Sequence, residues 1–161
     1  MSRGEDSEFV VPSVFDRMDA SGAAFRSRSH LQMLQELRSS VMRDVGNLLN
    51  TRRRSRPHGE ELTELVPSVM DYGLPDITGA DFVSQESREE FRVIVENALR
   101  RYEPRFSTVK VTLLDNRDTT DRTLRFRIDA MLRAEPAPEP VAFDSILEPI
   151  LGTFQVRGAR Q

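Results

Sequence analysis

The 161-residue chain contains no cysteine and only one lysine, Lys110. The absence of cysteine excludes disulfide bonds, zinc sites built on thiolates and a cysteine nucleophile. No segment approaches the roughly 18 consecutive apolar residues of a membrane-spanning helix, and the amino terminus lacks the basic and apolar regions of a signal peptide. We therefore expect a soluble, cytoplasmic protein without membrane insertion.

Neither sign of charge is in large excess. The formal net charge is -3, so the chain has no global basic field to attract nucleic acid, and we expect no nucleic-acid partner. Almost every cation is arginine. Arginine binds carboxylates in a bidentate manner and suits protein interfaces, although a GC-rich genome would produce the same bias.

Sequence signatures of enzymes are scarce. The two histidines, His30 and His58, lack the spacing of metal ligands, and no glycine-rich phosphate loop or nucleophile elbow is present. A glycosidase pair could in principle combine Glu103 as the acid with Asp76 or Asp115. Acidic residues are too common for this pairing to identify an enzyme, so we expect no catalytic site, no metal and no cofactor.

Apolar residues recur at three- and four-residue spacing in two segments, which predicts two amphipathic helices. The first covers residues 30–50, with Ser29 as its N-cap. The second covers about residues 87–102, with Ser87 and Glu90 at capping-box spacing. The apolar faces that we expect to be buried comprise Leu31, Leu34, Leu37, Val41, Val45, Leu48, Leu49, Phe91, Ile94, Val95, Ala98, Leu99 and Tyr102.

The periodicity changes to two after the second helix, as is typical of half-buried strands. Residues 107–115 and 123–132 are predicted to form an antiparallel hairpin, and residues 141–147 and 153–157 two further strands. Helices followed by an antiparallel sheet predict an α+β domain, in which two main amino-terminal helices pack on a small carboxyl-terminal sheet.

The length predicts one domain, residues 30–157, between a flexible amino-terminal arm of residues 1–29 and a tail of residues 158–161. The arm carries one apolar island, "FVVPSVFDRM", which would dock either on its own domain or on a neighbour.

Two loops carry distinctive residues. The segment Arg52 to Arg56 is basic, and its side chains either form a solvated turn or contact an acidic partner surface or a nucleic-acid backbone. Residues 68–79 combine turn signals with apolar side chains, which predicts a compact, packed loop.

At the last turn, Ile150 and Leu151 would pack either on a neighbour or on the core.

The stretch Glu103-Pro104-Arg105 breaks a local rule at the end of the second predicted helix. Glu103 places an anion at the negative end of the helix dipole, and Pro104 ends the helix and restricts the residue before it. A stiff carboxylate beside a stiff guanidinium can bind a partner with little ordering entropy, and as surface residues both should be replaceable with little effect on folding. In the alternative, Glu103 pairs internally with Arg100 or Arg125, and Arg105 is solvated.

Several motifs occur in a specific order along the chain: "PSVFDRM", "LLNTRR", "YGLPD", "YEPR", "LRFRIDAMLR", "EPVAFDSIL" and "GTFQV". Over roughly residues 12–156, the chain thereby resembles the TssE family of baseplate subunits of bacterial type VI secretion systems. That family is part of the wider group of contractile-phage baseplate wedge proteins once labelled lysozyme-related. The resemblance implies a structural protein, not an enzyme, with a fold similar to the connecting domain of contractile sheath proteins.

The resemblance also implies partners. It implies a wedge subunit held by TssF and TssG in a large six-fold baseplate that includes TssK, assembled at the inner face of the cell envelope. This subunit would be the platform on which the sheath proteins TssB and TssC assemble. Glu103, Pro104 and Arg105 would contact the helical core bundle of the wedge. A contractile phage tail or related injection particle is the alternative machine, and a peptidoglycan hydrolase using Glu103 is a distant alternative.

The last predicted strand should leave an unpaired sheet edge, which presents backbone donors and acceptors to a visiting strand. Strand addition there would give a sheath arm main-chain hydrogen bonds. The sheath-facing residues would be Thr153, Phe154, Gln155 and Val156, and proline at Gln155 should remove one donor of the ladder.

Overall fold

The computed structural model describes residues 30–53, 71–77, 80, 82, 84–116, 123–134 and 137–159. The predicted flexible arm of residues 1–29, His58 and the greater part of the arginine loop lie outside these residues. The last two residues of the predicted tail also lie outside them.

Two helices precede the sheet, as the apolar spacing predicted. Helix α2 spans His30–Asn50 and helix α3 spans Gln85–Tyr102. The N-cap of α3 is Ser84, whose hydroxyl accepts a hydrogen bond from the Ser87 N–H at 3.0 Å. The predicted capping box starting at Ser87 is therefore wrong, because a hydroxyl three residues earlier already caps the first turn. Neither α2 nor α3 is long and apolar enough to cross a membrane.

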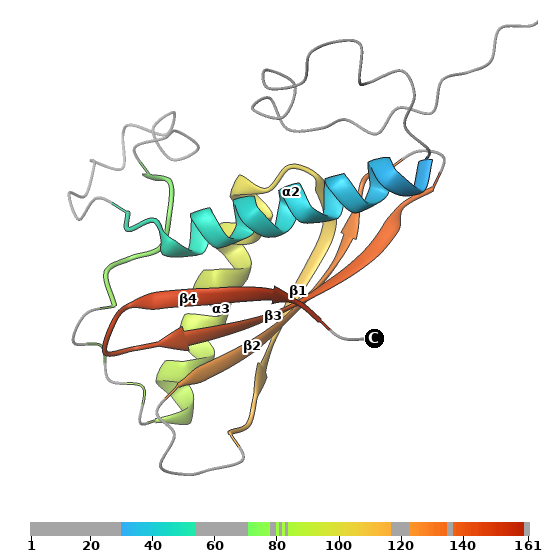
Figure 1. Cartoon of the computed structure of the whole chain (residues 1–161). Helices are drawn as coiled ribbons and strands as arrows, with labels where there is room; N and C mark the ends of the chain where they lie inside the picture. The colour runs from blue at the N-terminus through green and yellow to red at the C-terminus, as the bar shows by residue number, and fades with distance from the viewer. Residues whose placement is uncertain are drawn as a thin grey trace, which may run out of the picture.

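Four strands follow the helices in a simple meander. They are β1 (Phe106–Leu114), β2 (Leu124–Leu132), β3 (Glu139–Glu148) and β4 (Thr153–Gly158). Each strand pairs antiparallel with the next, in the order β1-β2-β3-β4 (Figure 1). The predicted α+β architecture, with helices first and an antiparallel sheet after, is confirmed.

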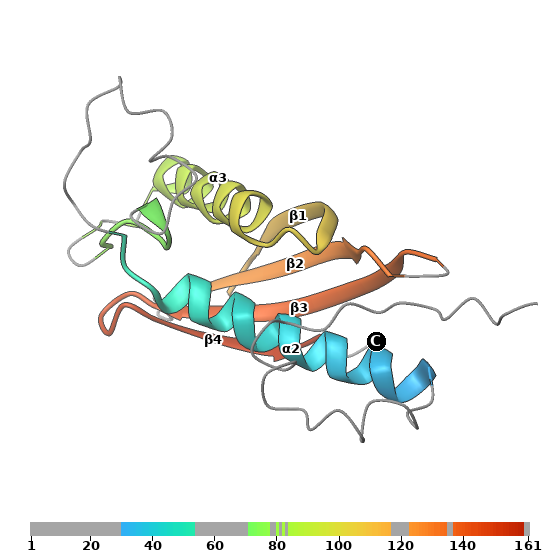
Figure 2. The same cartoon turned by 90° about the horizontal axis from the view of Figure 1, so that it is seen from above.

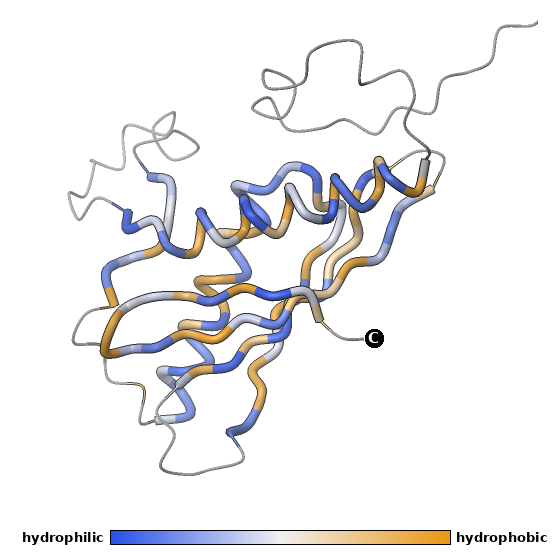
Figure 3. Tube along the Cα trace, viewed as in Figure 1, coloured by the Kyte–Doolittle hydropathy of each residue, from blue (hydrophilic) through white to orange (hydrophobic). Residues whose placement is uncertain are grey.

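One face of the sheet forms the core together with both helices. Buried and more exposed residues alternate along β2 and β3, and Figure 3 shows the same alternation as hydropathy. Helix α3 packs against β1 and helix α2 against β4, and the view in Figure 2 shows the two helices beside the sheet. The side chains in the centre of the core are almost wholly inaccessible to water: Val41, Val95, Leu99, Phe126, Ile128, Leu132 and Leu147.

Two residues of the predicted apolar faces do not belong to the core. Leu31 is 72% exposed and Ile94 is 39% exposed. Helix α2 has 21 residues, about 31 Å, whereas the six residues of β4 span only about 20 Å. The first turn of α2 therefore extends beyond the strand on which the helix packs. Helical periodicity identifies the apolar face but does not report where the supporting strand ends.

Both edges of the sheet are capped by side chains from the helices. At β4, the Asn50 side chain accepts the Phe154 N–H at 2.9 Å and donates to the Phe154 carbonyl at 3.0 Å. At β1, Glu96 accepts the Val111 N–H at 3.0 Å and Arg92 donates to the Val111 carbonyl at 3.1 Å. At one residue on each edge, helix side chains thus make the two hydrogen bonds that a neighbouring strand would make.

The cap on β4 predicts the behaviour of an Asn50→Ala variant. This variant loses the two hydrogen bonds to Phe154 and a third, exposed one to the Gly46 carbonyl, which should lower the free energy of unfolding by about 1–2 kcal/mol, and it opens the β4 edge to self-association. Thermal unfolding and light scattering measure the two effects. Asn47→Ala, an exposed position three residues earlier on α2, is the matched control; equal behaviour of the two variants would show that the cap contributes nothing.

Candidate functional site

The segment Glu103-Pro104-Arg105 forms a hydrogen-bonded corner between α3 and β1. The Glu103 N–H donates to the Leu99 carbonyl at 3.0 Å and closes the last turn of α3. Pro104 ends the helix, because its ring has no N–H to donate and clashes with the preceding turn. The Phe106 N–H then donates to the Glu103 carbonyl at 3.1 Å, so the backbone is held on both sides of the proline.

Glu103 and Arg105 bind each other. The Arg105 Nε donates to Glu103 Oε1 at 2.6 Å, and Arg105 Nη2 donates to Glu103 Oε2. The side chains are only 5% and 19% exposed. The expectation of a surface pair is therefore wrong for Glu103. The alternative expectation, in which Glu103 pairs with Arg100 or Arg125, is also wrong. Glu103 pairs with Arg105, and Arg100 pairs with Glu96 at 2.9 Å.

Arg105 also ties the corner to helix α2. Its Nη2 donates to Asp44 Oδ2 at 2.7 Å and its Nη1 donates to Ser40 Oγ at 3.3 Å. Burial lowers the pKa of the Arg105 guanidinium, but the hydrogen bonds and charges of Glu103 and Asp44 outweigh burial and raise the pKa above its ordinary value. The cation is thereby fixed at the junction of α2, α3 and β1.

Sequence reasoning missed the two α2 residues of this junction. Ser40 and Asp44 are four residues apart and therefore lie on one side of α2. Each directly precedes a buried valine, Val41 or Val45. Two polar residues at four-residue spacing, each next to a residue of the apolar face, are the sequence signal that could have identified Ser40 and Asp44.

The position of Glu103 does not suit a catalytic acid. A glycosidase acid must present a proton to its substrate, whereas both Glu103 oxygens face the Arg105 guanidinium in the protein interior. Of the proposed partner carboxylates, Asp76 pairs with Arg52 at 3.6 Å. Among the residues that the structure describes, no group of three or more histidine and acidic side chains could hold a metal ion.

The motifs "LLNTRR" and "YGLPD" meet beside this junction. The Leu74 N–H donates to the Thr51 carbonyl at 2.8 Å, and the Arg53 N–H donates to the Leu74 carbonyl at 2.6 Å, which makes a short parallel bridge. Gly73 has φ +108°, and a Cβ atom there would lie 2.3 Å from the Thr51 carbonyl oxygen. Only glycine fits this close approach. The described part of the loop is compact, as predicted, with Leu74 and Ile77 buried.

Asp71 organises a second cluster around the end of α3. Its carboxylate lies 3.4 Å from Arg53 and 3.2 Å from Arg101, and the Tyr102 hydroxyl donates to the Asp71 carbonyl at 2.8 Å. Tyr102 and Tyr72 make an edge-to-face ring contact at 5.2 Å. Arg52 and Arg53 are thus paired with acidic residues of the loop that they contact, and Arg54 and Arg56 lie outside the described residues.

Tyr72 connects the two clusters. Burial raises the pKa of its hydroxyl above the ordinary value, and the nearby charges of Asp44 and Glu103 raise it further. The Tyr72 ring thus contacts Tyr102 of the Asp71 cluster, and its hydroxyl is within electrostatic range of the carboxylates of the Arg105 junction.

The proposed sheath-facing strand has its backbone oriented by the Asn50 cap. Successive residues of a strand direct their N–H and C=O groups to opposite edges. Because the Phe154 groups bond to Asn50 at the outer edge, the Gln155 groups face β3 and the Val156 groups face outward. Thr153 and Gln155 are exposed, Val156 is half-buried and Phe154 is buried. Proline at Gln155 would therefore remove an internal donor, not an outward one.

The buried junction predicts that Glu103→Ala is destabilising. Removing the carboxylate leaves the Arg105 guanidinium with Asp44 and the Ser40 hydroxyl, and the loss of charged hydrogen bonds should lower the free energy of unfolding by about 1.5–3 kcal/mol. Glu90→Ala, an exposed position on α3, should change it by less than about 0.5 kcal/mol. Urea denaturation compares the two variants, and equal small losses would contradict the role of the pair.

Ile150 and Leu151 at the β3–β4 turn are both largely exposed. The expectation that these two side chains pack on the core of their own domain is therefore wrong, and packing on a neighbouring protein stays a prediction.

Comparison with known proteins gives one match. The family model of baseplate wedge protein gp25 matches residues 35–137, a range that contains most of α2, all of α3, β1 and β2, and the Glu103-Pro104-Arg105 corner. No curated protein and no solved structure matches the chain in these comparisons. The matched range covers more than half of the chain, and the chain belongs to the gp25 family of baseplate wedge proteins.

Proposed function

We propose that this chain is a structural wedge subunit of a type VI secretion baseplate, with residues 30–157 as its wedge domain. The observation that carries the proposal is the family match, which makes the chain a baseplate wedge protein. The motifs "LLNTRR", "YGLPD" and "YEPR" in this order resemble the TssE family, and a contractile phage tail is the alternative machine. Genes for TssF, TssG, TssK, TssB and TssC beside its own gene would support this choice, and phage tail genes would contradict it.

In this proposal, the Glu103-Pro104-Arg105 corner docks on the wedge core bundle formed with TssF and TssG. Glu103 and Arg105 are engaged with each other, and Pro104 between them is exposed. The buried pair fixes the shape of the corner, while Pro104 and the accessible part of Arg105 meet the bundle. A preorganised corner binds with a small loss of conformational entropy, which suits a permanent structural contact.

Substitution of Pro104 tests this contact without breaking the buried pair. Pro104→Glu should leave thermal unfolding nearly unchanged, because the residue is exposed, but should weaken binding to a co-expressed TssF–TssG complex at least tenfold. Pro138→Glu, at another exposed proline, is the matched control. Co-purification at graded concentrations gives the apparent affinities. Equal binding of both variants would contradict docking through this corner.

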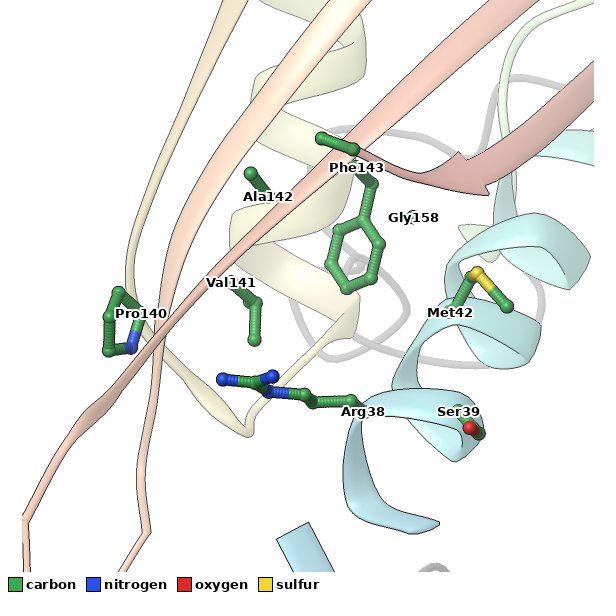
Figure 4. A pocket seen from close by; sticks show the side chains of 9 residues that line it. Arg38, Ser39, Met42, Pro140, Val141, Ala142, Phe143 and Gly158 are labelled. Atoms are coloured by element: carbon green, nitrogen blue, oxygen red, sulfur yellow. The ribbon is translucent and has the colours of Figure 1, made fainter. Parts of the chain in front are cut away.

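We also propose that the β4 edge, at Thr153, Phe154, Gln155 and Val156, receives a strand from the sheath. The strand β3 continues past the end of β4, and beside it a groove of about 300 Å³ separates β3 from α2. Figure 4 shows Arg38 of α2 extending toward Val141 of β3, and Met42 of α2 and Phe143 of β3 also line the groove. An extended chain that pairs with the outward groups of Val156 would continue into this groove.

A pair of proline substitutions tests the direction of strand addition. Val156→Pro removes an outward N–H, so the subunit should fold and join the baseplate but no longer start sheath assembly. Gln155→Pro removes an N–H that faces β3 and should destabilise the fold by about 1 kcal/mol or more. Counting sheath structures formed by tagged TssB, together with thermal unfolding of each variant, measures both effects. Normal sheath assembly with Val156→Pro would refute strand addition at this edge.

A further inference from the structure

A surface cleft of about 560 Å³ lies between the 71–77 loop and the carboxyl-terminal half of α3. It adjoins the Asp71 cluster, which forms one of its walls. The described residues that line it are Arg53, Asp71, Gly73, Pro75, Ile94, Asn97, Ala98, Arg100, Arg101 and Tyr102. The cleft is separate from the groove beside β3, with which it shares no residue.

Cations outnumber anions in the lining of the cleft. Of the described residues that line it, three are arginines and one, Asp71, is a carboxylate; Arg100 also pairs with Glu96, which does not line the cleft, at 2.9 Å. Arg53 and Arg101 share this single carboxylate, and Arg100 extends from the same helix with 61% of its side chain exposed. A guanidinium has five N–H donors, so one shared carboxylate engages only part of the hydrogen-bonding capacity of two arginines.

Part of the lining of the cleft is apolar. It includes Ile94, which is 39% exposed although its spacing on α3 belongs to the buried face, together with Ala98 and Tyr102. A large aliphatic side chain left accessible beside arginine and tyrosine has the composition of an interface hot spot.

We infer that this cleft binds a segment of a protein partner that carries acidic side chains around one apolar anchor. The anchor would cover Ile94, and the acidic groups would pair with Arg53, Arg100 and Arg101. The composition favours protein over nucleic acid, because a phosphate backbone offers no apolar group to cover Ile94. The inference deepens the proposed function and rests on it only for the expectation that this partner is a baseplate protein.

Two neighbouring residues on α3 give a matched test. Val93 and Ile94 have almost equal exposure, 40% and 39%, but only Ile94 lines the cleft. Ile94→Glu should weaken binding of the full chain to the TssF–TssG complex at least tenfold, and Val93→Glu should not. Arg100→Glu should weaken binding in the same way, with Lys110→Glu on the exposed side of β1 as the charge control. Thermal unfolding of each variant checks that the fold is retained.

A photocrosslinker placed at Ile94, and in a second variant at Val93, identifies the partner segment by mass spectrometry in cells that make the whole machine. The inference expects crosslinks from position 94 alone, to a peptide that contains acidic residues. Crosslinks to a basic peptide or to nucleic acid would overturn it, and so would equal effects of Ile94→Glu and Val93→Glu combined with no crosslink from position 94. A crosslink from position 94 to an acidic segment of a protein outside the baseplate would support the cleft and contradict the proposed function.

Discussion

The guanidinium of Arg105 is the interaction on which the arrangement of the helices depends. It lies between Glu103, which ends α3, and Asp44 in the middle of α2, and its backbone leads into β1. Apolar packing alone would let two helices slide on a sheet, because it is non-directional. A partly buried cation that needs two carboxylates admits few positions, since any shift would leave a charge without its partner. The hydrogen bonds of Arg105 to Glu103 and Asp44 therefore restrict how α2 and α3 are placed relative to each other, and hydrophobic burial supplies most of the stability.

Polar side chains also restrict what can happen at the two edges of the sheet. A four-stranded meander has two open edges, and an open edge is a template for uncontrolled pairing. Here each edge is covered at one residue by helix side chains, Asn50 at Phe154 and the Arg92–Glu96 pair at Val111. On β4, this cover consists of the side-chain amide of Asn50. Beyond it, the outward groups of Val156 have no such cover from the Asn50 amide, and Gly158 and Ala159, which follow, line the groove beside β3.

The sequence predicted the parts of this fold that depend on repeating patterns. The three- and four-residue spacing located both helices, and the two-residue spacing located all four strands, because each pattern reflects one buried face. It did not predict that Leu31 would be exposed, since periodicity carries no information on where a neighbouring element ends, and it did not predict the cleft beside Ile94. It also placed Glu103 at the surface. The contacts of Arg105 with Ser40 and Asp44 join residues more than 60 positions apart, and no local pattern encodes such a contact.

The end of α3 shows how the chain separates rigidity from recognition. Arg100 and Arg101 occupy the last turn, where the helix dipole favours cations, and Glu103 follows where the dipole disfavours an anion. The guanidinium of Arg105 offsets this unfavourable position by binding both Glu103 oxygens. The carboxylate is thereby buried in a structural pair, while the side chains of Arg100 and Arg101 remain accessible and line the cleft with Ile94 and Tyr102. At the end of α3, Glu103 thus stabilises the fold, whereas Arg100 and Arg101 remain accessible to a partner. Substitution of Glu103 should therefore change the stability of the protein, and substitution of Arg100 should change the binding that we propose for the cleft.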